Sequence, residues 1–175
     1  MKMPATFIEE AQIRARVKEL GAEIRRDIGS DEPVHVIAVL KGAFVFMADL
    51  VRSIDGLVTL DFIAVSSYGS GSASSGQVRL LKDLDRSIEG RHVVVVEDIV
   101  DTGLTLSYLQ EILWARSPKS VRTACLLSKP SRRKVQVPVE YIGFTIEDRF
   151  VVGYGLDFDE QFRHLPYIGI MDGTT

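Results

Sequence analysis

The sequence has 175 residues, of which 46% are hydrophobic and 26% are charged. This length suits one domain with a buried core, and the composition argues against a disordered chain, a collagen or a coiled coil. Twenty-one basic and twenty-four acidic residues give a net charge of -3, without the broad basic field of a general nucleic-acid-binding protein. We expect a single domain over residues 1–175 that binds no nucleic acid.

The sequence also limits where the protein acts. Cys125 is the only cysteine, so no internal disulfide and no cysteine-based metal site can form. The N-terminus has no apolar run of signal-peptide length, and no stretch approaches the roughly 20 apolar residues that span a bilayer. We expect a cytoplasmic protein with no membrane association.

The first third of the chain predicts a helix, a strand and a second helix. Thr6 and Glu9 have the spacing of a capping box, and the apolar residues after them recur at helical intervals to Ile28. The segment 34–40 is short, apolar and rich in β-branched residues, as in a strand that is buried on both faces. Residues 43–54 return to a helical pattern.

A polar loop interrupts the pattern in the middle of the chain. Residues 57–65 predict a strand, and the segment 66–76, SSYGSGSASSG, consists mostly of serine and glycine. Such a composition predicts a flexible loop. Residues 77–81 have an extended pattern and are expected to pair with the preceding strand.

The rest of the chain completes an alternation of strands and helices. Residues 92–96, HVVVV, form the clearest buried strand, and residues 104–116 form a helix. Further strands are predicted at residues 121–127, 139–144 and 167–171. This order predicts an α/β fold class with a mostly parallel sheet flanked by helices on both faces.

An acidic pair follows the clearest strand. Glu97 and Asp98 come directly after it, and ligands of open α/β sheets bind at the carboxyl ends of strands. Two adjacent carboxylates repel each other unless a cation or hydroxyl donors satisfy them. A sugar diol and Mg²⁺ would do both, because Mg²⁺ prefers oxygen ligands. The alternative is a pair of hydrated acids at the start of a loop.

The turn at residues 101–105, DTGLT, opens the predicted helix. Its backbone amides and two hydroxyls can surround a phosphate, with a favourable helix dipole. Gly103 permits a close backbone approach or a positive φ. An ordinary helix cap at Asp101 or Thr102 is the alternative, but it explains neither the acidic pair nor the second threonine. Together the pair and the turn predict a site for a phosphorylated ribose.

The run VVVVEDIVDTGLTL at residues 93–106 resembles the phosphoribosyl-pyrophosphate signature of the type I phosphoribosyltransferases. Further matches narrow this resemblance to the hypoxanthine-guanine phosphoribosyltransferases: Leu40-Lys41-Gly42, Ser67-Tyr68, Lys129, and FVVGYGLD at residues 150–157. The resemblance implies the type I phosphoribosyltransferase fold. In that fold the N- and C-terminal segments form a small hood, and a flexible lid loop, here 66–76, starts at Ser67 and Tyr68.

The resemblance also implies roles for the residues of the acidic pair and the turn. Glu97 and Asp98 bind the ribose and, with Asp157, Mg²⁺. The 5′-phosphate is bound by Asp101, Thr102, Gly103, Leu104 and Thr105. Asp101 is in addition the general base at N7 of the purine, and thus the catalytic residue.

Outside this run, Lys41, Gly42 and Arg163 match positions that contact pyrophosphate. A plain turn at Lys41-Gly42 and a surface ion pair of Arg163 are the alternatives. The purine contacts implied are Lys129, Phe150, Val151 and Asp157. For Phe150, packing in the core is the alternative. Arg132, Arg133 and Lys134 are expected to form a solvated basic face.

The implied activity is a step of purine salvage. The 5-phosphoribosyl group moves from phosphoribosyl pyrophosphate to N9 of hypoxanthine, and of guanine, in the presence of Mg²⁺, and pyrophosphate leaves. Relatives form homodimers or homotetramers. Two alternatives remain: a regulatory protein that keeps this site and binds RNA or DNA, and an enzyme for xanthine or a pyrimidine. Lys129 and the block at 150–157 disfavour a pyrimidine.

Overall fold

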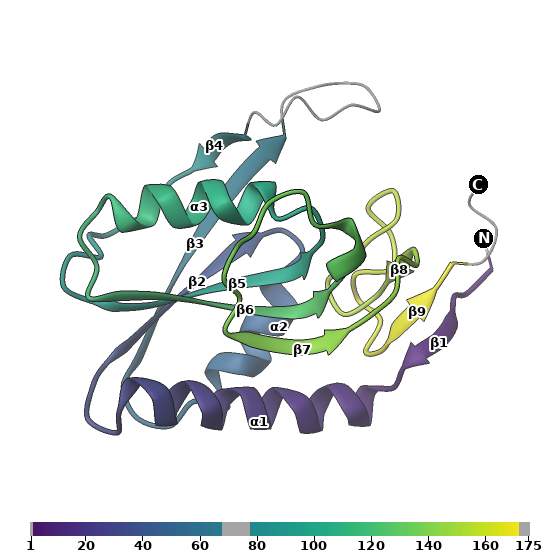
Figure 1. Ribbon diagram of the computed structural model, residues 1–175. Helices are drawn as coiled ribbons and strands as arrows, with labels where there is room; N and C mark the ends of the chain where they lie inside the picture. The colour runs from purple at the N-terminus through teal and green to yellow at the C-terminus, as the bar shows by residue number, and fades with distance from the viewer. Residues whose placement is uncertain (1, 68–77, 172–175) are drawn as a thin grey trace.

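A computed structural model describes residues 2–67 and 78–171 (Figure 1). The main sheet has the strand order β4-β3-β2-β5-β6-β7, in which only the edge strand β4 is antiparallel to its neighbour. Its strands are β2 (Val34–Leu40), β3 (Val58–Ser67), β4 (Val78–Lys82), β5 (His92–Val100), β6 (Ser120–Ser128) and β7 (Tyr141–Thr145). The helices are α1 (Glu10–Ile28), α2 (Phe44–Val51) and α3 (Leu104–Trp114), with a 3₁₀ turn, η1 (Pro130–Arg132), after β6.

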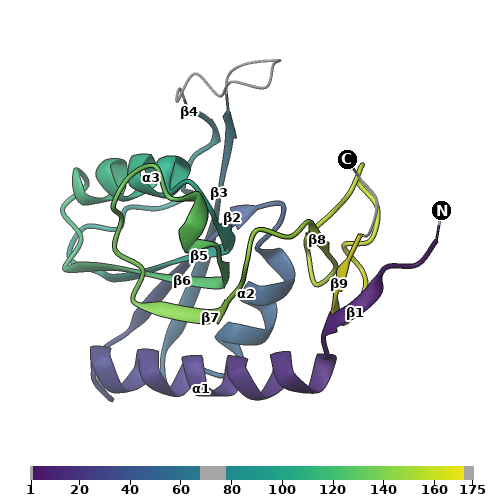
Figure 2. The ribbon, with the colours of Figure 1, turned by 45° about the vertical axis from the view of Figure 1, so that its right-hand side comes forward.

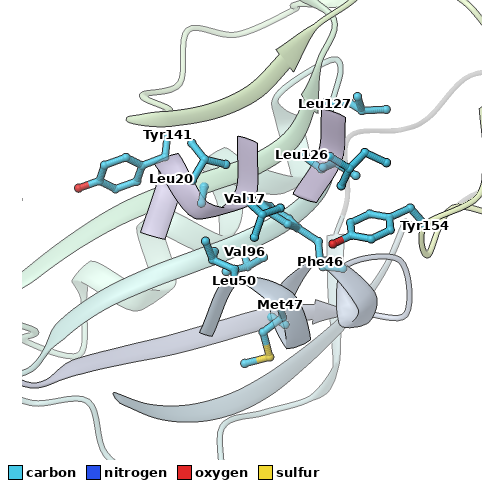
Figure 3. Close-up of a cluster of buried hydrophobic side chains, with 14 of the residues drawn as sticks. Val17, Leu20, Phe46, Met47, Leu50, Val96, Leu126, Leu127, Tyr141 and Tyr154 are labelled. Atoms are coloured by element: carbon cyan, nitrogen blue, oxygen red, sulfur yellow. The ribbon is translucent and has the colours of Figure 1, made fainter. Parts of the chain in front are cut away.

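Helices cover both faces of this sheet, as the alternation of elements predicts (Figure 2). The helices α1 and α2 lie on one face, where their apolar side chains pack against alternate residues of the strands, among them Val96 and Leu126 (Figure 3). On the other face α3 packs through Leu106, Leu109 and Leu113. Because the central strands are buried on both faces, their β-branched runs were a strong signal in the sequence.

A second, small sheet joins segments from near both ends of the chain. It has the order β1-β9-β8, with β1 (Ala5–Ile8), β8 (Val151–Val152) and β9 (Ile168–Ile170). Both pairings are antiparallel, and β9 is the central strand. This confirms that the N- and C-terminal segments come together beside the main sheet. The two strands β1 and β8 were not expected from the sequence.

The predicted capping box at Thr6 and Glu9 is wrong. Thr6 lies in β1, where it pairs with Gly169 of β9, so it cannot begin a helix. Glu9 is instead the residue that caps α1, and its backbone N–H donates a hydrogen bond to Oε1 of Gln12 at 2.9 Å. The helix therefore begins about one turn later than predicted, because the residues before it pair with β9.

Some element boundaries also differ from the expected ones. Ser66 and Ser67 were assigned to the flexible loop, but both belong to β3. The rest of the predicted lid, including Tyr68, lies outside the described residues. The strand β4 pairs with β3 as predicted, whereas α2 and α3 end earlier than expected. No helix in the described part of the chain is long and apolar enough to cross a membrane.

Candidate active site

Most of the predicted site residues lie at or directly after the carboxyl ends of β2, β5 and β6, whereas Phe150, Val151, Asp157 and Arg163 belong to the segment that contains β8. The chain passes from β2 to β3 on one side, and β5 pairs with β2 on the other. The strand order therefore reverses between β2 and β5, and such a point leaves a crevice at the carboxyl edge of the sheet. The loops after β2 and β5 meet there.

The acidic pair lies within the last part of β5 and not beyond it, because the strand continues to Val100. Glu97 is only 7% exposed, and burial raises its pKa well above the usual value, with a further rise from the charge of Asp98. Burial also raises the pKa of Asp98 to about 6, although a 2.7 Å hydrogen bond from the N–H of Ile99 opposes this. Neither carboxylate forms a salt bridge with a described residue. Bound hydroxyls or a cation would stabilise their ionised forms.

Gly42, in the loop after β2, is in close contact with this pair. A Cβ atom at Gly42 would lie 1.8 Å from Oδ2 of Asp98, so only glycine leaves room for the carboxylate. The preceding Leu40–Lys41 peptide bond is cis. The backbone of the loop after β2 therefore packs directly against a side chain at the end of β5.

The turn at residues 101–105 begins directly after β5. The N–H of Thr102 donates to Oδ1 of Asp101 at 2.6 Å, and the N–H of Leu104 lies 3.4 Å from the Thr102 hydroxyl. Gly103 has a φ of +82° and precedes the first residue of α3, a backbone conformation that glycine adopts without strain. The resulting cavity of about 200 Å³ is lined by the turn together with the acidic pair: Glu97, Asp98, Asp101, Thr102, Gly103 and Thr105.

The predicted pyrophosphate contacts share one carboxylate. Lys41 Nζ lies 2.8 Å from Oε2 of Glu160, and Arg163 Nη2 lies 3.1 Å from Oε1 of the same residue. Arg163 also contacts Asp157 at 3.2 Å and donates to the carbonyl oxygen of Gly155 at 2.7 Å. The ion pair that was the alternative for Arg163 is thus present, and it joins Arg163 to Lys41.

Lys129, at the end of β6, forms a second group of charges. The residue is 9% exposed, and its Nζ lies 3.4 Å from Oδ1 of Asp148. Arg132 Nη1 lies 3.2 Å from the other oxygen of Asp148, and Arg132 Nε lies 3.8 Å from Oδ2 of Asp101. The lysine is therefore connected to the turn after β5 through alternating charges.

Phe150 and Val151 belong to the small sheet region. Phe150 is 47% exposed, which contradicts the alternative of core packing, and its ring meets Phe158 edge-on with centroids 5.7 Å apart. Val151 is buried in β8 and pairs with Ile170. An exposed aromatic ring beside a buried strand can present a flat apolar surface to a ligand.

Three residues at the site were missed or misassigned from the sequence. Glu160 and Asp148 supply the counter-charges just described, and no local motif marked them. The expected solvated basic face is wrong for Arg133, which is partly buried and donates hydrogen bonds to the backbone after β5. A run of basic residues carries no information about which member turns inward.

Comparisons with known proteins agree with this geometry. A family model for the phosphoribosyl transferase domain matches residues 7–159. The hypoxanthine-guanine phosphoribosyltransferase of Bacillus subtilis (strain 168) is 51% identical over 165 residues, which cover 94% of this chain and 91% of that protein. The chain belongs to the hypoxanthine-guanine phosphoribosyltransferases.

Two further relatives of this family show the extent of the match. The hypoxanthine phosphoribosyltransferase of Escherichia coli (strain K12) is 53% identical over 166 residues, covering 93% of this chain and 92% of that protein. A crystal structure of a Bacillus anthracis hypoxanthine-guanine phosphoribosyltransferase, with HEPES in its active site, is 49% identical with a TM-score of 0.93. That alignment covers 97% of this chain and 99% of the other.

The family implies Mg²⁺, and the carboxylates at the site fit it in part. Among residues 2–67 and 78–171 no group of three or more His, Cys, Asp or Glu side chains could hold a metal by itself. Mg²⁺ is usually bound by one or two carboxylates together with waters and substrate oxygens, and the carboxylates of Glu97 and Asp98, which line one cavity, suit that mode. The structure does not group Asp157 with this pair, so its predicted metal contact stays a prediction.

The contact between Gly42 and Asp98 generates a testable prediction for this phosphoribosyltransferase. Gly42→Ala places a methyl group where the Asp98 carboxylate lies, so the loop and the acidic pair must move apart. We expect kcat/KM to fall by about 100-fold or more, as displacements of about 1 Å do at active sites. Gly90→Ala is the control for a loss of stability without a clash, because the φ of +69° at Gly90 strains an alanine while a Cβ there meets no atom within 4 Å. Steady-state kinetics of both variants provide the measurement, and wild-type kcat/KM in Gly42→Ala would contradict the prediction.

Proposed function

We propose that this chain transfers the 5-phosphoribosyl group from phosphoribosyl pyrophosphate to N9 of hypoxanthine, and of guanine, with release of pyrophosphate. The observation that carries the proposal is that one cavity is lined by both the acidic pair and the turn after β5. Oxygen acceptors for sugar hydroxyls thus lie beside backbone amides suited to a phosphate. The similarity to named hypoxanthine phosphoribosyltransferases supports the same activity.

The donor is held at its ribose and its 5′-phosphate. The residues Asp101, Thr102, Gly103, Leu104 and Thr105 surround the phosphate at the start of α3, where the helix dipole favours an anion. The carboxylates of Glu97 and Asp98 accept hydrogen bonds from the ribose hydroxyls. When bound, Mg²⁺ supplies positive charge to the donor's oxygens. Glu97 and Asp98 would hold it, with Asp157 a more distant candidate.

The leaving group is stabilised by cations. In the reaction the bond between C1 of the ribose and the pyrophosphate oxygen breaks, and its electron pair leaves with pyrophosphate. Lys41 and Arg163 place positive charge where this negative charge develops, and the backbone at Gly42 approaches it closely. Preorganised charges of this kind often supply the largest part of catalysis. A guanidinium is well suited to bidentate contacts with phosphate oxygens.

The purine is held at the hood side of the cavity. Lys129 donates to the exocyclic oxygen of a 6-oxopurine, which disfavours the amino group of adenine. Phe150 stacks on the base, an assignment supported by its exposed ring. The backbone of Val151 and the carboxylate of Asp157 complete the contacts. N9 attacks C1, and Asp101 accepts the proton from N7.

The regulatory alternative loses its main support. A basic face of Arg132, Arg133 and Lys134 would favour binding of RNA or DNA, but Arg133 is turned inward and Arg132 is paired with Asp148. We further propose that the enzyme acts in the cytoplasm as a homodimer or homotetramer. Exposed apolar side chains of α2 and β3, Phe44 and Leu60, lie on the same face of the sheet and support self-association.

A competition assay tests the proposed function. Hypoxanthine, guanine, xanthine and adenine are supplied together with phosphoribosyl pyrophosphate and Mg²⁺, and the nucleotides formed are separated and quantified. We expect hypoxanthine and guanine to be consumed and adenine to be left, because Lys129 is a donor and cannot accept from an amino group. Preferred turnover of adenine, or turnover of none of the four, would refute the assignment.

Replacing the proposed general base tests the mechanism. In Asp101→Asn we expect kcat to fall by about 10²–10⁴-fold, the usual contribution of proton transfer. The fold should persist, because the Asp101 side chain is 47% exposed and an asparagine oxygen can still accept from Thr102 N–H. The exposed Asp55→Asn is the control. The measurement is the initial rate of each variant at saturating substrate concentrations. An unchanged kcat in Asp101→Asn would show that Asp101 is not the general base.

Glu160 offers a test of the pyrophosphate contacts. Its carboxylate binds Lys41 and Arg163, so it competes with pyrophosphate oxygens for the same cations. In Glu160→Gln we expect a lower KM for phosphoribosyl pyrophosphate and stronger inhibition by pyrophosphate. The change should be at most about fivefold, because exposed ion pairs contribute about 0.2–1 kcal/mol.

The neighbouring Asp159→Asn is the matched control for Glu160→Gln, since Asp159 is exposed and has no ion pair with a described residue. The KM for phosphoribosyl pyrophosphate and the inhibition constant for pyrophosphate are both obtained from steady-state kinetics. If Glu160→Gln and Asp159→Asn give the same inhibition constant for pyrophosphate, Lys41 and Arg163 do not bind the leaving group in the way proposed.

A further inference from the structure

Arg133 connects the two loops that carry the proposed purine contacts. Its Nη1 donates to the carbonyl oxygens of Val100 and Asp101 at 2.7 and 2.8 Å, and lies 3.4 Å from that of Lys129. Its Nη2 donates to the hydroxyl of Ser128 at 2.9 Å. One guanidinium thus binds the end of β5, the first residue of the phosphate turn and the end of β6.

We infer that Arg133 is a positioning residue, which sets the separation of Asp101 and Lys129 and thereby the recognition of the purine. This inference rests on the proposed function, in which Asp101 acts at N7 and Lys129 at the exocyclic oxygen. These two atoms are neighbours on one edge of a 6-oxopurine. Two side chains from different loops therefore have to be held at a matching spacing, and a 1 Å error costs about 100-fold in rate.

Backbone contacts alone leave this spacing less defined. The N–H of Lys129 donates to the carbonyl oxygen of Val100 at 2.9 Å, and the N–H of Lys134 donates to that of Thr102 at 2.9 Å. These bonds keep the loops adjacent, but only the bond between Lys129 and Val100 lies close to the backbone of both Asp101 and Lys129. Arg133 adds contacts at the carbonyl groups of Asp101 and Lys129 themselves, so each residue is tied at its own peptide group.

The chemistry of arginine suits this role. A guanidinium is planar and presents several donors in a fixed fork, so it can bind acceptors from both loops at defined angles. A lysine ammonium at the same position is a single flexible point charge, and it would reach only part of this set. The carbonyl of Asp101 and the hydroxyl of Ser128 lie on separate arms of the fork.

The test compares Arg133→Met and Arg133→Lys with Lys134→Met, a control at the adjacent exposed lysine. For each variant, KM and kcat are measured separately for hypoxanthine and for phosphoribosyl pyrophosphate, together with the rate ratio for hypoxanthine over adenine. In Arg133→Met we expect kcat/KM for hypoxanthine to fall by about 10- to 100-fold. The hypoxanthine-to-adenine ratio should fall as well, while KM for the donor changes less. Arg133→Lys should restore only part of the loss.

The outcomes separate a positioning role from a structural one. If Arg133→Met and Arg133→Lys melt at a lower temperature but keep the wild-type KM for hypoxanthine and the wild-type purine preference, the inference is overturned. If Arg133→Met fails to fold, the same kinetic constants are measured for Arg133→Lys and Ser128→Ala. Ser128→Ala removes one contact of the Arg133 guanidinium. A wild-type enzyme that does not use hypoxanthine would instead refute the proposed function, before any variant is compared.

Discussion

The site depends on the buried carboxylate of Glu97 and the partly buried carboxylate of Asp98, which lie where the strand order of the sheet reverses. Glu97 and Asp98 stand at the end of a strand that is covered on both faces, so water cannot fully solvate them. The chain makes this arrangement possible by bringing the backbone of Gly42 against the carboxylate of Asp98, with no side chain between. A larger residue there would separate the loops after β2 and β5, which together form the crevice.

The charges of the site are arranged asymmetrically. Each proposed ligand-binding cation already has a carboxylate partner from the chain: Lys41 has Glu160, Arg163 has Asp157 and Glu160, and Lys129 has Asp148. Glu97 and the partly buried Asp98 form no such ion pair with a described residue, although the positive charge of Arg163 lowers the pKa of Asp98. The ion pair of Lys41 with Glu160 is exposed on both sides, and such pairs contribute little, so Lys41 can exchange this partner for the oxygens of a ligand. The buried acids instead gain most from a ligand, because it brings the hydroxyls and the cation that the protein itself does not supply.

The parts of the fold and site that the sequence predicts are local or strongly patterned. The β-branched runs of β2 and β5 and the helical spacing of α1 predict their elements because burial imposes the pattern directly. The acidic pair and the phosphate turn lie within nine residues of chain, so their association could be read from spacing alone. The family resemblance then added Lys41, Lys129 and Arg163 to the predicted site, and their ligand contacts stay proposals.

What the sequence could not predict depends on contacts between distant segments. The capping box at Thr6 failed because β9, more than 150 residues later, takes that residue into a sheet. Arg133 was expected in solvent, since a basic run does not indicate that the chain after β6 folds back over the end of β5. The counter-charges of Glu160 and Asp148 were equally invisible, because each pairs with a cation that only the fold brings near.

The position of β9 has a consequence for biosynthesis. This strand is the centre of the small sheet, and without it neither β1 nor β8 has a partner there. Because Ile168–Ile170 follows β1, β8 and every strand of the main sheet along the chain, ribosomes translate it after them. The turn at residues 101–105 and the acidic pair therefore emerge long before β9, whereas Val151 of β8 can pair in the small sheet only once β9 has been made.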